Sequence, residues 1–97
     1  MGDMILSIAQ DSVRDDILQF RMLVKAGAPP NRLREIWYGI LALIEDEKDM
    51  YPEELHPEVF FKNRTRFTRR GTRPMIKVYL YKVHRYLDAI DNTNLAR

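Results

Sequence analysis

Apolar residues recur at helical spacing in the first part of the chain. Val13, Ile17, Phe20 and Val24 follow one another at intervals of four, three and four residues. This spacing places the four side chains on one face of an α-helix. The segment therefore predicts an amphipathic helix that buries this face.

Polar residues and a glycine mark the ends of this first helix. Asp11 or Ser12 is suited to cap its start, because a short side-chain oxygen can accept a hydrogen bond from a free backbone N–H. Gly27 can end the helix, and the proline pair that follows prevents its continuation. Residues 4–9 then form either a first turn or a short separate helix.

A second helix is predicted over residues 32–50, with Asn31 as its cap and Pro52 beyond its end. Its apolar stripe comprises Leu33, Ile36, Trp37, Ile40, Leu43 and Ile44. Its last turns are acidic. Carboxylates oppose the dipole at the C-terminal end of a helix, so this end favours a cationic partner.

Residues 51–63 carry two prolines, each suited to a first helical position, and predict one or two short helical turns. Phe60 and Phe61 are adjacent in this segment. Two neighbouring side chains in a short turn cannot easily both point inward. Either one of them is an exposed anchor for a partner, or both pack beneath the basic residues that follow.

A third long helix is predicted over residues 73–92, opened by Thr72 and Pro74. The apolar positions occur at intervals of four, three, four and three: Ile76, Leu80, Val83, Leu87 and Ile90. Residues 75–83 are also rich in β-branched and aromatic residues, which are frequent in strands. The helical pattern persists for about four turns, which favours a helix. The predicted fold class is all-α: a small helical bundle with three main helices and a basic loop before the last helix.

Composition narrows the class of protein. A chain of 97 residues with 45% hydrophobic and 31% charged residues is typical of one globular domain, here residues 1–97. The absence of cysteine excludes disulfides, thiolate zinc sites and cysteine nucleophiles, and it fits a cytoplasmic protein. We expect neither a signal peptide nor a membrane span, because no apolar run is long enough.

Charge is distributed unevenly along the chain. Residues 1–58 carry 12 acidic and 6 basic residues, whereas residues 59–97 carry 2 acidic and 10 basic residues. No carboxylate side chain occurs between positions 59 and 87. This pattern predicts a one-sided positive surface that meets a polyanion.

The strongest candidate for that surface is the basic loop 62–73 together with one face of the third helix. Basic side chains neutralise phosphates by releasing counterions, and exposed aromatic rings stack on unpaired bases. The predicted phosphate contacts are Lys62, Arg64, Arg66, Arg69, Arg70, Arg73, Lys77, Lys82 and Arg85, with Phe67 and Tyr81 as stacking residues. The predicted function is therefore non-enzymatic binding of DNA or RNA, as an accessory component of a nucleoprotein assembly.

An alternative function uses the same charges without nucleic acid. The acidic segment 45–58 and the basic segment 62–85 are complementary, within one chain or between neighbouring copies. The chain would then be a protein–protein interaction subunit or an inhibitor, and association between copies would form an oligomer.

The first two helices also allow a helix-turn-helix interpretation. Gly27 lies in the turn, and Arg32 and Arg34 open the second helix as reading residues do. That second helix is apolar through residues 37–44, which is typical of a buried helix. An ordinary helical hairpin is therefore the favoured interpretation.

Metal-dependent and catalytic functions receive less support. The acidic residues lack the spacing of an EF-hand loop, and His56 and His84 are far apart, so we expect no metal and no cofactor. A metal-independent ribonuclease remains an alternative, because it works with a mixed set such as Arg73, Lys77, Tyr81, His84 and Arg85. On a helix face this mixture more often contacts phosphate alone. We therefore expect no catalytic residues and no small-molecule substrate.

Overall fold

The computed structural model describes residues 6–62 and 73–95. Within these ranges the elements are α1 (Ile8–Lys25), α2 (Pro30–Asp46), the 3-10 helices η1 (Lys48–Met50) and η2 (Glu53–Leu55), α3 (Pro57–Phe60) and α4 (Arg73–Leu95). No strand occurs among the described residues, so the predicted all-α class is confirmed. The strand interpretation of residues 75–83 is wrong, because they lie inside α4.

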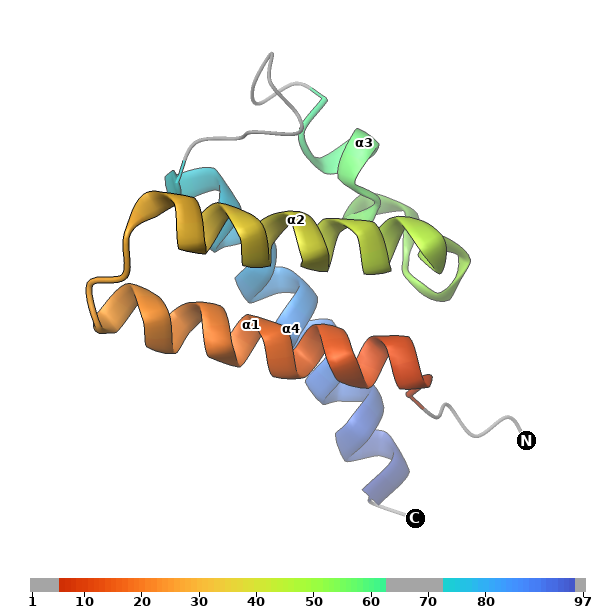
Figure 1. Cartoon of the computed structure of the whole chain (residues 1–97). Helices are drawn as coiled ribbons and strands as arrows, with labels where there is room; N and C mark the ends of the chain where they lie inside the picture. The colour runs from red at the N-terminus through yellow and green to blue at the C-terminus, as the bar shows by residue number, and fades with distance from the viewer. Residues whose placement is uncertain (1–5, 63–72, 96–97) are drawn as a thin grey trace.

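The three long helices are arranged as a hairpin crossed by a third helix. α1 and α2 run antiparallel beside each other, and α4 crosses behind them (Figure 1). Most of the apolar stripe of α2 is buried against the other helices, including Leu33, Trp37 and Ile40, whereas Ile36 and Leu43 are partly buried at its edge. The helical hairpin is thus the arrangement adopted, and the middle of α2 is part of the core.

α1 begins at Ile8, so residues 8 and 9 belong to its first turn, which was one of the two alternatives for residues 4–9. Ser7 caps it: its hydroxyl accepts a hydrogen bond from the Gln10 backbone N–H at 2.9 Å, and the Gln10 side chain accepts one from the Ser7 N–H at 3.1 Å. Asp11 and Ser12 lie inside the helix, so their predicted role as caps is wrong. The reciprocal bonds form a capping box, which satisfies two free N–H groups at once. Gly27 ends the helix region with a φ of 76°, as predicted.

The Ser7 cap leads to a stability prediction. We expect Ser7→Ala to lower the free energy of unfolding by about 1 kcal/mol, because the helix loses its cap acceptor. The Ser7 hydroxyl also donates to Glu47 Oε1 at 2.7 Å, so a second contact is lost. Urea denaturation measures the effect. Ser12→Ala is the matched control, and equal losses in both variants would contradict the capping role of Ser7.

The start of α2 also differs from the prediction. Pro29 occupies the cap position and Pro30 the first helical turn, so Asn31 lies within the helix and is not its cap. The fixed φ of proline is already suited to the first turn, and its missing N–H is one that a helix start leaves unbonded. α2 ends at Asp46 rather than near residue 50, and η1 follows it.

The short turns after α2 agree with the prediction. η2 has Pro52 at its cap position, and α3 has Pro57 in its first turn. Phe60 and Phe61 are both buried, with 3% and 0% of their surface exposed. The exposed-anchor alternative for this pair is therefore wrong.

The core is built around an aromatic cluster. Trp37 packs edge-on against Phe61 and Tyr79, with ring centroids 5.9 and 5.8 Å apart. The Tyr79 hydroxyl donates a hydrogen bond to the Leu55 carbonyl at 2.7 Å, which ties α4 to η2. All five predicted apolar positions of α4 are buried, and Tyr79 widens this face. The cluster joins α2, α4 and the segment between them.

Candidate nucleic-acid interface

The structure describes part of the predicted interface. Lys62, Lys77, Tyr81, Lys82 and Arg85 are exposed at the surface. The other predicted contacts lie outside the described residues: Arg64, Arg66, Phe67, Arg69, Arg70 and the side chain of Arg73. The described candidates, apart from Lys62, all lie on α4.

α4 brings together one aromatic ring and two basic side chains. Lys77, Tyr81 and Arg85 recur every four residues and so share one face of the helix. Tyr81 is 51% exposed, and the Arg85 guanidinium lies 5.9 Å from the centroid of its ring. This cation–π contact helps to fix the ring on the surface. Lys82 is exposed as well, but it lies about 100° further round the helix.

A groove separates this face of α4 from the C-terminal half of α1. Its volume is about 310 Å³. The lining residues are Phe20, Arg21, Val24 and Lys25 from α1, and Lys77, Leu80 and Tyr81 from α4. The floor is apolar, since Phe20 and Leu80 are only 4% and 3% exposed. The rim is cationic, and no Asp or Glu is among the lining residues.

Arg21 and Lys25 are site residues that the sequence interpretation missed. Each directly follows a member of the apolar stripe of α1, Phe20 and Val24 respectively. Both therefore lie on the same edge of that stripe, one turn apart. This spacing is visible in the sequence, but it does not show that the edge faces Lys77 of α4.

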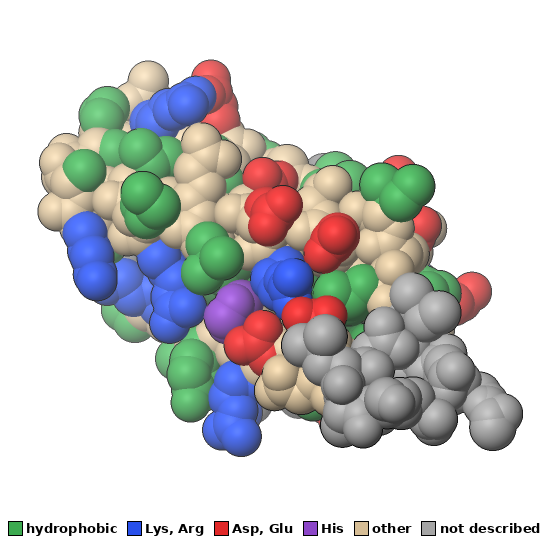
Figure 2. All heavy atoms as spheres, turned by 90° about the horizontal axis from the view of Figure 1, so that it is seen from below, with side chains coloured by type: hydrophobic (Ala, Val, Ile, Leu, Met, Phe, Trp, Pro, Cys, Tyr) green, Lys and Arg blue, Asp and Glu red, His purple; other side chains and the backbone are tan. Residues whose placement is uncertain are grey.

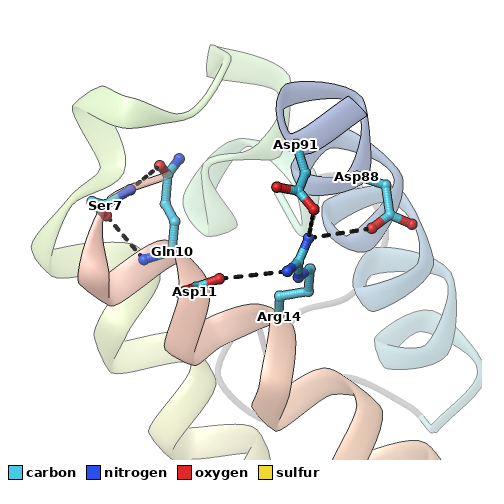
Figure 3. Close-up of polar contacts among 6 residues, drawn as sticks. All are labelled: Ser7, Gln10, Asp11, Arg14, Asp88 and Asp91. Atoms are coloured by element: carbon cyan, nitrogen blue, oxygen red, sulfur yellow. Dashed lines mark hydrogen bonds and ion pairs between the residues drawn. The ribbon is translucent and has the colours of Figure 1, made fainter. Parts of the chain in front are cut away.

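Other basic side chains are neutralised within the fold. The guanidinium of Arg14 lies 2.6 Å from Asp91, 3.9 Å from Asp88 and 3.6 Å from Asp11 (Figure 3). The hydrogen bond that Arg14 donates to the Asp91 carboxylate raises the pKa of Arg14. This network joins α1 to α4, and it neutralises the charge of Arg14 within the fold.

Two further cations are paired close to their own positions. Arg32 lies 3.4 Å from Glu35, and Lys48 lies 2.7 Å from Glu58. The hydrogen bond from Lys48 lowers the pKa of Glu58. These pairs are partly exposed and add little stability, but they reduce the positive charge on their parts of the surface.

The cations around the groove are different. Within the described ranges 6–62 and 73–95, no ion-pair partner is found for Arg21, Lys25, Lys77 or Arg85. Figure 2 shows Lys and Arg side chains gathered toward the left of the lower face, and Asp and Glu toward its middle and right. Unneutralised positive charge thus lies on both walls of an apolar groove, and Arg34, Lys62 and Lys82 are further exposed cations without an ion pair among the described residues.

The Arg14 network leads to a second stability prediction. We expect Arg14→Ala to lower the free energy of unfolding by about 1–3 kcal/mol, because it removes the charged hydrogen bond to Asp91 and leaves that carboxylate without its cation. The Arg14 side chain is only 23% exposed, whereas that of Arg32 is 52% exposed. Arg32→Ala is therefore the control, with an expected change within about 0.5 kcal/mol. Equal effects in urea denaturation would contradict a special role for Arg14.

The acidic end of α2 and the segment after it lie away from the groove. α2 ends at the right of Figure 1, whereas the end of α1 that lines the groove lies at the left. Five carboxylates there are exposed and have no ion-pair partner among the described residues: Glu45, Asp46, Asp49, Glu53 and Glu54. The basic residues 63–72, predicted as one possible partner, lie outside the described residues. The described surface is therefore bipolar.

The two histidines serve separate local contacts. His56 Nε2 lies 2.8 Å from the Lys48 carbonyl oxygen, and His84 Nδ1 lies 3.5 Å from Asp88. In the described part of the chain, no group of three or more His, Asp or Glu side chains is placed to hold a metal ion. Among the same residues, no helix combines the length and apolar character needed to cross a membrane.

Comparisons with models of protein families, with curated proteins and with solved structures found no significant match to this chain. Its function must therefore be inferred from the chemistry of its own surface.

Proposed function

We propose that the protein binds nucleic acid without catalysing a reaction on it, through the cationic groove and the exposed face of α4. The observation that carries this proposal is the set of unpaired cations beside an exposed aromatic ring, Tyr81. Phosphates supply the negative charge that Arg21, Lys25, Lys77 and Arg85 lack within the described fold. The basic residues 62–73 extend the same surface in this proposal.

The proposed setting is a cytoplasmic nucleoprotein assembly. The exposed carboxylates at and after the end of α2 stay free for a protein component of that assembly, because the cationic groove lies at the other end of the hairpin. Binding to a phosphate backbone does not require a particular base sequence, so the proposed role is that of an accessory component.

A salt-dependent titration tests this function. Labelled DNA and RNA, single-stranded and duplex, are titrated with the protein at 50 and 200 mM salt. With about five phosphates neutralised, affinity is expected to fall by about 10²- to 10³-fold between these concentrations. Absence of binding to every probe at the lower salt concentration would refute the proposal.

A single substitution tests the role of the α4 face. Lys77→Gln is expected to weaken binding to all sequences by a similar factor and to reduce the salt slope by about 1, as for one lost phosphate contact. Arg34→Gln is the control, because Arg34 is exposed on α2 and does not line the groove. An unchanged slope for Lys77→Gln would remove this residue from the interface.

The bipolar surface also supports a second candidate function, protein–protein association through complementary charges. Opposite charges at opposite ends of a molecule favour head-to-tail contacts between copies. Sedimentation velocity at low and high salt tests this candidate. Oligomers that form at low salt and dissociate at high salt would support this candidate function. A monomer under both conditions would count against self-association.

A further inference from the structure

We propose that the groove between α1 and α4 holds an unpaired base, so that the protein prefers single-stranded nucleic acid to duplex. This inference rests on the proposed nucleic-acid binding and names the substrate class of that site. It concerns the seven groove-lining residues, all of which the structure describes.

The two parts of the groove match the two parts of a nucleotide. A base has flat, weakly polar faces, and Phe20, Val24 and Leu80 provide an apolar floor for it. The attached phosphates are anionic, and the rim carries Arg21 and Lys25 on one wall and Lys77 on the other. Cations on both walls allow the backbone to enter and leave the groove beside a basic residue. The volume of about 310 Å³ is at the lower end for small-molecule pockets, as a ligand no larger than one base requires.

Tyr81 adds a stacking surface at the mouth of the groove. Its ring is half-exposed and is held by the Arg85 guanidinium at 5.9 Å. A ring that is already fixed loses less conformational entropy when a base stacks on it. In a duplex, neighbouring base pairs cover both faces of every base, and taking one base out costs a few kcal/mol. The groove therefore favours a strand whose bases are already unpaired.

The length of the groove argues against a docked helix from a protein partner. The lining residues span positions 20–25 of α1 and 77–81 of α4. At the rise of an α-helix these stretches are about 7.5 and 6 Å long. A docked amphipathic helix uses anchors from i to i+7, which cover about 10.5 Å. The groove is shorter than that and fits one inserted group.

The test compares labelled oligothymidylate, oligouridylate and a duplex of the same length at low salt. Both single strands are expected to bind more tightly than the duplex, and the ratio between them shows whether DNA or RNA is preferred. Tyr81→Ala is expected to weaken single-strand binding by roughly 5- to 150-fold and to leave duplex binding and the salt slope nearly unchanged. Tyr81→Phe should retain the affinity for single strands.

Tyr38→Ala is the matched control, because Tyr38 is 39% exposed on α2 and does not line the groove. Circular dichroism confirms that both alanine variants are folded. Equal affinity for single strands and duplex, or equal losses in the two variants, would overturn the base-binding inference and leave nucleic-acid binding intact. No binding to any probe would overturn both. Binding of an acidic amphipathic peptide in place of the oligonucleotides would assign the groove to a protein partner.

Discussion

Replacing Trp37 by alanine is expected to lower the free energy of unfolding by about 3–5 kcal/mol. The side chain is only 2% exposed and is the largest among the fully buried residues. Its ring contacts Phe61, next to α3, and Tyr79 of α4. Removing it leaves a cavity at the point where three parts of the chain meet.

A loss of this size is a large fraction of the about 5–15 kcal/mol by which small domains are stable. Urea denaturation followed by far-ultraviolet circular dichroism is the suitable measurement, because the variant has no tryptophan left to report by fluorescence. Tyr38→Ala changes the next position on α2, where the side chain is 39% exposed, and should cost much less. A change below about 1 kcal/mol for Trp37→Ala would contradict its central place in the core.

The long helices could be predicted from the sequence because their periodicity extends over several turns. On α4 the predicted core positions are all buried, and Lys77, Tyr81 and Arg85 are all exposed. A stripe of this length leaves one way to bury its apolar side chains. The spacing of residues along the helix is therefore enough to predict which face of α4 is buried and which is exposed.

Helix starts were predicted less well, because several residues compete for the same role. Ser7, Asp11 and Ser12 are all good caps by residue type, and the reciprocal bonds with Gln10 favour Ser7. At α2, the preference of asparagine for the cap position is overridden by Pro30, whose ring geometry suits the first turn. In both cases, neighbouring residues determine which of several suitable residues occupies the cap position.

Only one of the two walls of the groove could be predicted from the sequence. Its α4 wall follows from the spacing of Lys77 and Tyr81, whereas its α1 wall depends on how two helices distant in sequence cross. Which cations are neutralised within the fold also depends on contacts between residues distant in sequence. Arg14 is separated from Asp91 by 77 positions, so no local pattern shows that it is paired. Tertiary contacts thus determine which basic residues remain available to a ligand.

Reversing two groove charges, Lys25→Glu together with Lys77→Glu, is expected to weaken nucleic-acid binding by about 10²- to 10³-fold at 50 mM salt. Each reversal removes a phosphate contact and adds repulsion, and the two residues act from opposite walls of the groove. Both side chains are exposed and have no ion-pair partner among the described residues. The cost to stability should stay within a few tenths of a kcal/mol per residue, mainly from the carboxylate at the C-terminal end of α1.

The double reversal Arg32→Glu and Arg34→Glu is the control that distinguishes an effect of the groove from an effect of the net charge of the protein. It changes the formal charge of the protein by the same amount, but at exposed positions of α2 outside the groove. Carboxylates near the start of a helix are favourable, so this control should remain folded. If the groove holds the ligand, only the first pair of reversals produces the large loss in a binding titration. Equal losses would mean that binding follows total charge, because long-range attraction depends on the net charge and local phosphate contacts depend on position.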